Sequence, residues 1–494
     1  MRRLLALGLG CLASFTASSE DLLTIFDQAV VNDPTVREAE FTRQATREAR
    51  PQAWAAYLPQ ISGSYNKGEN EGDQVQTGGQ QIPDPNNPGR FVLQPFAQNQ
   101  SFSPETSNWG IQLRQTVFNW GGLVALKQSS RIAAQADADY GAAQQDLALR
   151  VSTRYFDVLA ALDNMQAQQA ALDAISRQLE QADKRFEVGL IAITDVQEAR
   201  AARDTAAADL IAAKRAYATS QELLREITDM QYQVLSTPRG TMPLAIPEPA
   251  DPQKWVEASM EQNLALTSSR LGAEIARDNV RTAFGGHLPT VDLVVGKSHS
   301  ESADVADFPA VPGVFDGGSV PSGRDTDIDK SIELQVQVPI WSSGGTHSRV
   351  KQESYRWQAA KQRVERVSRE TERTARDAYL GVMSEISRVE ALKQALESSR
   401  TALKATEAGY DVGTRTAIDV LATRRTLVQA YTNYSRSRYD YMLNVLRLKQ
   451  AAGLLDRKAL EDVNSWLEAP PPPGTTPTPV PVPVPAPTPT PPAQ

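Results

Sequence analysis

The sequence predicts a mainly α-helical protein with a small β part, in which strands and long helices form two repeats. The first observation is a short signature that occurs at residues 188–196 and again at residues 412–420, 224 positions later. The second is a pair of long tracts without proline. The third is a set of four stretches in which apolar and polar residues alternate. Other anchors recur in the same order, 223 to 230 positions apart, so the chain is predicted to be one architecture built twice.

The first 19 residues are predicted to be a signal peptide. Arg2 and Arg3 precede an apolar run from Leu4 to Ala13, and small residues follow up to Ser19. The only cysteine, Cys11, lies in that run, so the mature chain would have no disulfide and no thiolate metal site. Lipidation of Cys11 is the alternative, but residues 8–10 match poorly the triplet that usually precedes a lipidated cysteine.

The two proline-free tracts are predicted to be long helical hairpins. In the first repeat, residues 122–188 would form a helix of about 100 Å, and residues 195–229 and 251–284 would return. In the second repeat, residues 345–412 would lead out and residues 419–453 would return, with residues 20–54 supplying the missing piece. Apolar residues at seven-residue intervals indicate coiled-coil packing. They are Val151, Val158, Met165, Leu172, Leu179 and Phe186, and, 224 positions later, Ala375, Val382, Val389, Leu396, Leu403 and Tyr410.

Four strands are predicted in the stretches 61–65, 109–117, 291–295 and 332–340, each with an apolar and a mostly polar face. The polar segments 66–108 and 298–330 are expected to be exposed loops. No later segment has 18 consecutive apolar residues, so a membrane could be crossed only by a closed barrel. Four strands cannot close one, whereas two copies give eight strands and three copies give twelve around a lumen. A strand pair on a soluble core is the alternative.

Domain boundaries follow from the repeat and from proline content. The first repeat is assigned to residues 20–235, a proline-rich connector to 236–252, and the second repeat to 253–468. Residues 469–494 hold 13 prolines and are expected to be a disordered, solvated tail of polyproline II type.

Three segments resemble TolC-type outer-membrane channels of Gram-negative bacteria: residues 186–197, 409–416 and 286–290. The resemblance implies a homotrimer with a 12-stranded outer-membrane β-barrel, four strands per chain, continuous with a periplasmic α-helical coiled-coil barrel. It implies an exit duct for tripartite multidrug efflux, type I protein secretion, or both. The implied partners are outer-membrane lipid, a periplasmic adaptor (membrane fusion) protein and an inner-membrane transporter of RND, ABC or MFS type. Neither a cofactor nor a metal is implied.

The same resemblance assigns roles near the helix turns. Asp195 would pair with Tyr410 and Arg415 as a latch, and Asp419 would contribute to a constriction ring. Gly189 and Gly413 would form the hairpin turns where the adaptor docks. One departure is Ala422, where a known member of the family has a second aspartate.

Simpler explanations exist for these turn residues and for the tryptophans. A glycine can end a helix, and a carboxylate in the first turn favours the helix dipole. Thr194 with Gln197, and Thr416 with Asp419, resemble capping boxes. Trp109, Trp120 and Trp341, near strand ends, are expected to form an interfacial aromatic belt, although each could be an ordinary packed aromatic.

Two other functional classes explain less of the sequence. A periplasmic coiled-coil adaptor or scaffold without a pore also has helical hairpins, but it would not need four duplicated strands of this kind. An enzyme fits less well, because His287, His299 and His347 are scattered and no catalytic motif is present. The net charge of −8 argues against a nucleic-acid partner.

Overall fold

The structure is a computed structural model that describes residues 20–69, 72–102, 105–232, 234–240, 242–308 and 318–469. The predicted signal peptide and the tail from residue 470 onward lie outside the described residues. The chain divides into two compact units. The first, here called the helical unit, comprises Met1–Thr42, Ala138–Thr267 and Glu365–Gln494. The second, the sheet unit, comprises Arg43–Asp137 and Ser268–Val364.

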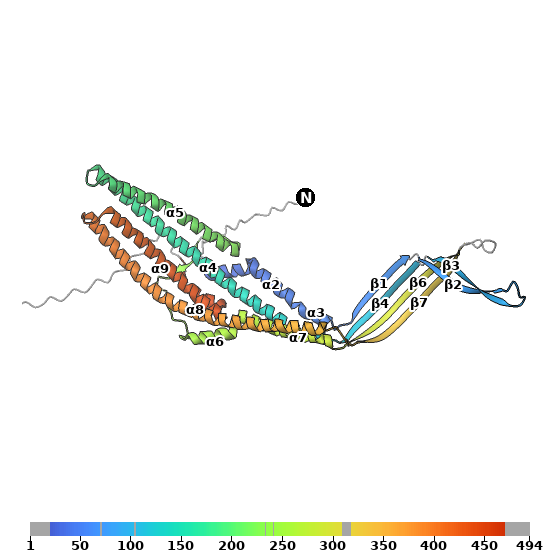
Figure 1. Ribbon diagram of the computed structural model, residues 1–494. Helices are drawn as coiled ribbons and strands as arrows, with labels where there is room; N and C mark the ends of the chain where they lie inside the picture. The colour runs from blue at the N-terminus through green and yellow to red at the C-terminus, as the bar shows by residue number, and fades with distance from the viewer. Residues whose placement is uncertain are drawn as a thin grey trace, which may run out of the picture. The chain divides into compact units, whose positions relative to one another are not determined.

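Four antiparallel strands form the main part of the sheet, in the order β1-β4-β6-β7 (Figure 1). They are β1 (Gln60–Glu69), β4 (Glu105–Phe118), β6 (Thr290–Phe308) and β7 (Gly318–Gln337). Each of the four predicted stretches lies largely in one of these strands. The alternating residues are therefore on opposite faces, as the period of two requires.

The prediction of exposed loops at 66–108 and 298–330 was wrong for most of their length. A second hairpin, β2 (Gly72–Pro83) with β3 (Phe91–Phe102), lies within the first segment. In the second segment, β6 and β7 stay paired as far as Phe308 and Gly318. The physical reason is that backbone hydrogen bonds continue the ladder after the apolar alternation has stopped, and polarity of the side chains does not interrupt them.

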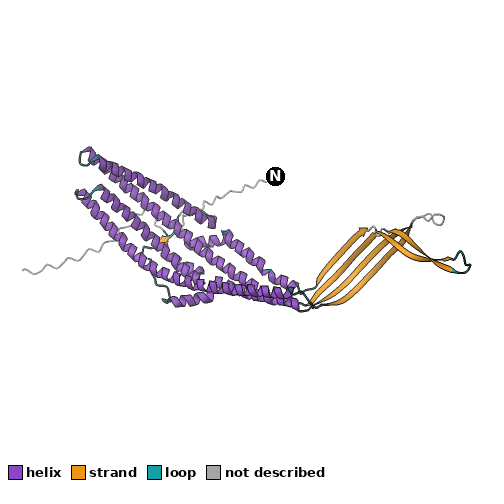
Figure 2. Cartoon of the chain, viewed as in Figure 1, coloured by secondary structure: helices purple, strands orange, loops and turns teal. Residues whose placement is uncertain are grey.

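Two long helical hairpins carry most of the helical residues, as Figure 2 shows in purple. The first consists of α4 (Trp120–Glu187) and α5 (Ile193–Thr228), and the second of α8 (Gly345–Asp411) and α9 (Ala417–Ala451). The 68 residues of α4 correspond to about 100 Å of helix. The predicted bounds of these four helices are confirmed to within a few residues.

The shorter helices are broken where single helices were predicted, so those predictions were wrong. The N-terminal piece consists of α1 (Leu22–Asn32), α2 (Pro34–Arg47) and α3 (Ala49–Ala55). The later piece consists of α6 (Pro252–Gln262) and α7 (Leu264–Phe284). Asp33 and Asn263 lie at these breaks and have extended backbones. The backbone N–H of each donates the last hydrogen bond of the preceding helix, and the side-chain oxygen of each caps the start of the next helix. They are 230 positions apart, so the break itself is duplicated.

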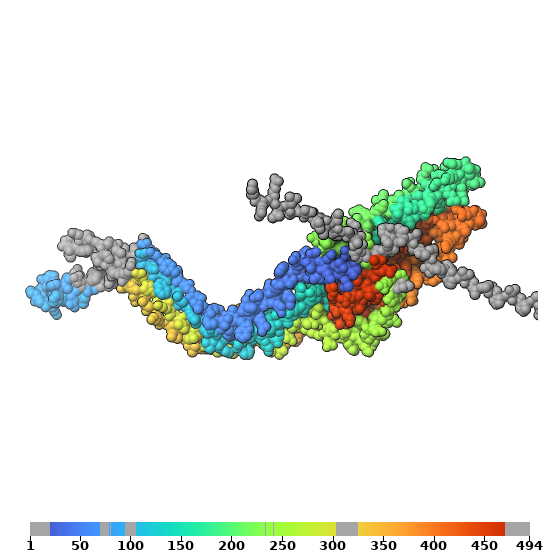
Figure 3. Space-filling model, turned by 180° about the vertical axis from the view of Figure 1, so that it is seen from behind, coloured from blue at the N-terminus to red at the C-terminus, as the bar shows by residue number. Residues whose placement is uncertain are grey.

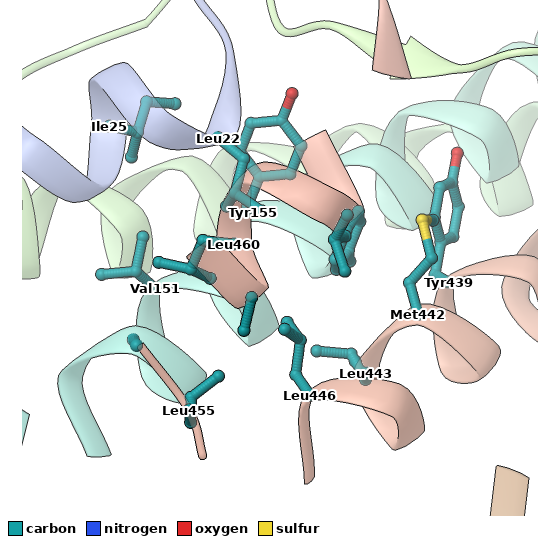
Figure 4. Packing of buried hydrophobic residues seen from close by; sticks show 14 of the residues in the cluster. Leu22, Ile25, Val151, Tyr155, Tyr439, Met442, Leu443, Leu446, Leu455 and Leu460 are labelled. Carbon is teal, nitrogen blue, oxygen red and sulfur yellow. The ribbon is translucent and has the colours of Figure 1, made fainter. Parts of the chain in front are cut away.

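The main hydrophobic core of the helical unit joins residues from both ends of the chain (Figure 4). Leu22 and Ile25 of α1 lie in one cluster with Tyr155 of α4, Leu446 of α9 and Leu460 of α10 (Arg457–Asn464), all at most 1% exposed. In Figure 3 the C-terminal surface, in red, lies between the blue α1 and the lime-green segment around α6. This cluster ties the start and end of the described chain to both hairpins.

Candidate functional site at the hairpin turns

Both hairpins turn at a left-handed glycine. Gly189 has φ of 77° and Gly413 has φ of 76°, a conformation that costs other residues about 1–2 kcal/mol. The backbone N–H of Gly189 donates to the Phe186 carbonyl at 2.8 Å, and the N–H of Leu190 donates to the Arg185 carbonyl at 2.9 Å. The second turn repeats this double pattern 224 positions later. The glycines therefore act as helix C-caps; adaptor docking at them stays a prediction.

The return helix of the second hairpin begins with the predicted capping box. The Thr416 hydroxyl accepts from the Asp419 N–H at 3.3 Å, and the Asp419 carboxylate accepts from the Thr416 N–H at 3.1 Å. These hydrogen bonds from Thr416, with a smaller contribution from the charge of Arg415, hold the pKa of Asp419 below its usual value. Asp419 therefore stays ionised at neutral pH, as a constriction ring would need, although that role stays a prediction.

The return helix of the first hairpin has no such cap, so the predicted box of Thr194 with Gln197 was wrong. The helix begins at Ile193, its N-cap is Ala192, and no side chain caps it. Thr194 is therefore already inside the first turn, where its hydroxyl is misplaced for capping. Asp195 lies in that first turn, as expected for a carboxylate at the positive end of a helix.

A different set of side chains bridges the two hairpins within one chain. The Arg185 guanidinium carbon lies 5.0 Å from the centroid of the Tyr410 ring. One of its nitrogens lies 3.7 Å from an Asp411 carboxylate oxygen. The turns of the two hairpins also lie side by side in Figure 3, in green and orange. Arg185 is therefore a functional candidate that the sequence reasoning missed.

The predicted latch is not assembled within one chain. In the described part of the chain, the Asp195 carboxylate has neither a hydrogen bond nor an ion pair. The Arg415 side chain instead lies against Gly409, where an added Cβ would be 2.8 Å from Arg415 Cγ. A bond from Asp195 to Tyr410 or Arg415 would need a neighbouring chain or a shift of the hairpins.

A signal for Arg185 was present in the repeat itself. Its counterpart 224 positions later is Gly409, whereas the counterpart of Tyr410 is Phe186. The residues that form the bridge are therefore positions where the two copies differ, and comparing the copies residue by residue would have found them.

Apolar side chains are exposed at both turns. Val188, Leu190 and Val412 are 70%, 72% and 75% exposed. Along the heptad series of α8, Ala375 and Val382 are fully buried, while Leu403 and Tyr410 near the turn are only half-buried. A single chain thus leaves apolar surface uncovered at the turns.

The three tryptophans have different surroundings in the sheet unit. Trp109 of β4 lies 5.7 Å from the His299 ring of β6 and is 37% exposed. Trp120 is the first residue of α4, and its indole N–H donates to the Arg281 carbonyl at 3.1 Å. Trp341 follows β7 and is largely exposed. Their role as an aromatic belt stays a prediction.

Among the described residues, no group of three or more histidine, cysteine, aspartate or glutamate side chains could hold a metal ion. Within the same residues, no helix combines the length and apolarity needed to cross a membrane.

Comparison with known proteins identifies the family. The sequence model described as "Outer membrane efflux protein" matches residues 25–228 and 255–454, most of the chain. This chain belongs to the outer membrane efflux protein family. The predicted membership is therefore confirmed, and the protein is an outer-membrane protein.

The similarity of this outer membrane efflux protein to its relatives extends over nearly its whole length. It is 35% identical to the outer membrane protein TolC of Vibrio cholerae, over 95% of this chain and 99% of that protein. It is 31% identical to TolC of Escherichia coli, over 95% and 90%. It is 25% identical to the alkaline protease secretion protein AprF of Pseudomonas aeruginosa, over 89% and 86%.

A solved structure agrees with the fold. The CmeC outer membrane channel of Campylobacter jejuni is 17% identical and has a TM-score of 0.65, covering 91% of this chain and 90% of that one. At this identity the likeness concerns the fold alone. It supports the mainly helical architecture with a small sheet.

Proposed function

We propose that the protein is a trimeric exit duct of the outer membrane for efflux and protein secretion. The observation that carries this is the sheet. In the described residues, β1 pairs only with β4 and β7 pairs only with β6, so two long edges are open. An open edge in lipid costs several kcal/mol per unsatisfied backbone group. Three chains would join these edges into a barrel of twelve strands.

The side chains of β7 fit this assembly. Ile332, Leu334 and Val336 share one face and are 79%, 64% and 57% exposed. Glu333 and Gln335 lie on the other face. An apolar face toward lipid and a polar face toward a lumen is the alternation that a transmembrane barrel needs. The helical hairpins would then continue the duct into the periplasm.

The hairpin turns are proposed to form the gate of the duct. Arg185 with Tyr410 and Asp411 would hold the two hairpins of one chain together, and Asp195 with Tyr410 and Arg415 would latch neighbouring chains. Exposed contacts of this kind contribute roughly 0–1 kcal/mol each. Threefold repetition would give a closed state favoured by a few kcal/mol, which docking of an adaptor and an inner-membrane transporter could reverse.

Single-channel recording in planar bilayers tests this function directly. The purified trimer carrying Tyr410→Phe and Arg415→Ser should conduct more than the wild type, because the latch donors are removed. The matched control is Tyr355→Phe, an exposed tyrosine of α8 in the sheet unit. Unchanged conductance of the double variant would rule out the latch, and absence of any channel would rule out the duct.

Fractionation separates the duct from an adaptor without a pore. The duct predicts trimers in the outer-membrane fraction that dissociate only on heating. A periplasmic monomer would contradict it. The substrate class is proposed from the relatives alone, since an efflux channel and a protease secretion protein are both similar to this chain.

A further inference from the structure

A groove lined by tyrosines lies in the helical unit. Its volume is about 670 Å³, and its walls come from α4, α5, α8, α9 and the segment around residues 232–238. No described segment fills it. Five tyrosines contribute to its lining: Tyr217, Tyr232, Tyr431, Tyr434 and Tyr439.

The last described residues of the chain lie at the rim of this groove. The short strand β8 (Leu467–Glu468) pairs antiparallel with β5 (Thr237–Pro238), and both residues of β5 line the groove. Thr237 faces Glu468, so a continuation of the same register would run beside Ser236 and then Leu235. Leu235 is also a lining residue. The chain that leaves Glu468 is therefore directed along the groove wall.

The charged groups of the groove already have partners. The Asp163 carboxylate accepts a hydrogen bond from the Tyr439 hydroxyl at 2.7 Å. Arg438 donates to the carbonyls of Pro238 and Arg239. Arg400 pairs with Glu397 at 2.6 Å. An uncharged occupant suits such a groove, because it would not compete with these pairs.

Two tyrosine hydroxyls remain able to donate. The Tyr434 hydroxyl has no hydrogen-bond partner among the residues that the structure describes. The Tyr217 hydroxyl accepts from the Gln221 amide at 3.1 Å, which leaves its own hydrogen for another acceptor. The groove thus offers flat aromatic rings together with O–H donors.

We propose that a stretch of residues 470–494 of this chain binds in the tyrosine-lined groove as a polyproline II segment. The segment has 13 prolines and no charged residue. A polyproline II helix makes no internal hydrogen bonds, so its carbonyls can accept from tyrosine hydroxyls while its rings pack on aromatic faces. At 3.1 Å per residue the segment can extend roughly 80 Å, enough to follow the groove.

Tethering makes even weak binding effective. A segment attached at the groove rim has an effective concentration on the order of millimolar, so an intrinsic Kd of about 0.1 mM gives roughly a tenfold excess of bound over free tail. A bound tail would contact α4 and α5 on one side and α8 and α9 on the other. It would therefore brace the two hairpins against each other, a role independent of the proposed duct.

Peptide binding tests the groove. A fluorescently labelled peptide of residues 470–494 is added to detergent-solubilised protein that ends at Ala469, and anisotropy is measured. The truncated protein should bind it at least tenfold more tightly than the full chain, whose own tail occupies the groove. Tyr217→Ala with Tyr434→Ala should weaken binding at least tenfold, whereas the control Tyr355→Ala should not. Equal binding by truncated and full-length protein, or by the tyrosine variant, would overturn the proposal.

Photo-cross-linking identifies the occupant in the intact assembly. With p-benzoylphenylalanine at position 434 of the full chain, mass spectrometry should find adducts to peptides from residues 470–494. Adducts to helices of a second copy, or no adduct, would overturn the proposal. This readout does not depend on conduction, so it succeeds or fails separately from the duct.

Discussion

Replacing Arg185 by glutamine tests whether the two hairpins of one chain are held together at their turns. The substitution keeps the inner part of the aliphatic stem and a polar end, and it removes the positive charge. In the structure the guanidinium lies 5.0 Å from the Tyr410 ring centroid and 3.7 Å from the Asp411 carboxylate. A cation–π contact at an exposed site contributes about 0.5–1 kcal/mol. The ion pair contributes little, because the Asp411 side chain is 67% exposed.

The expected loss is therefore about 1 kcal/mol per chain. If three chains act together, the loss is about 3 kcal/mol, which corresponds to roughly a hundredfold change in the ratio of closed to open turns. Pulsed dipolar spectroscopy can measure this with spin labels at Leu190→Cys and Val412→Cys. Both positions are more than 70% exposed, and the only native cysteine lies in the predicted signal peptide.

The Arg185→Gln variant should show a broader and longer distribution of distances between the hairpins. Tyr410→Leu should have the same effect, and the two changes together should add little, because they remove one contact. Lys184→Gln is the matched control, since it removes the neighbouring charge, which pairs with Glu180 of the same helix at 2.6 Å and not with the second hairpin. An unchanged distribution in Arg185→Gln, or fully additive effects in the double variant, would refute the reasoning.

Three further predictions concern the helical unit. Thr416→Ala removes the capping hydroxyl and should lower the stability of the first turn of α9 by about 1 kcal/mol, seen as faster amide exchange there, while Thr416→Ser should preserve it. Gly453→Ala should lower the melting temperature far more than Gly413→Ala, although both glycines have positive φ. The new Cβ at position 453 would clash with the Gln262 carbonyl oxygen, whereas a Cβ at position 413 would have no atom within 4 Å. Asp163→Asn should flatten the pH dependence of stability. Partial burial raises the pKa of Asp163 despite its hydrogen bond from Tyr439, so the native state binds a proton at Asp163 more tightly than the unfolded state does. The wild type therefore loses stability as the pH rises above the unfolded pKa of about 4. Melting curves from pH 4 to 8 should show the advantage of the variant growing with pH, and a constant difference would contradict this.

The long helices and their turns could be predicted because their signals are local and repeated. Exclusion of proline and the seven-residue period fix the helices, and a glycine at the end of the pattern fixes each turn. The extra hairpin β2–β3 could not be predicted in the same way. Its sequence does not place an apolar residue at every second position, so the period of two does not mark its strands.

The helix breaks show where local signals stop. Asp33 precedes Pro34, and a residue before proline disfavours the helical conformation, so this break had a signal in the sequence. Asn263 precedes a leucine and has no such signal. Its break depends on tertiary contacts, because the Asn263 amide donates to the Ala451 carbonyl at 3.1 Å and Gly453 packs against the same bend. The break at Asn263 could have been predicted only from the break at Asp33, by assuming that the two repeats break at equivalent positions.

The contacts at the hairpin turns could be predicted only in part, for a related reason. A pattern common to both copies locates the turns, but a bridge between the copies requires complementary residues and so must lie where they differ. Arg185 reaches Tyr410, whereas its counterpart Gly409 has no side chain to reach Phe186. A side chain at position 409 would also be obstructed, because its Cβ would lie 2.8 Å from Arg415 Cγ. The bridge therefore forms only from the first hairpin to the second and has no counterpart in the opposite direction. A trimer would have three such bridges, one per chain, instead of six. Each hairpin would then have one bridged side and one side left for a neighbouring chain or an adaptor.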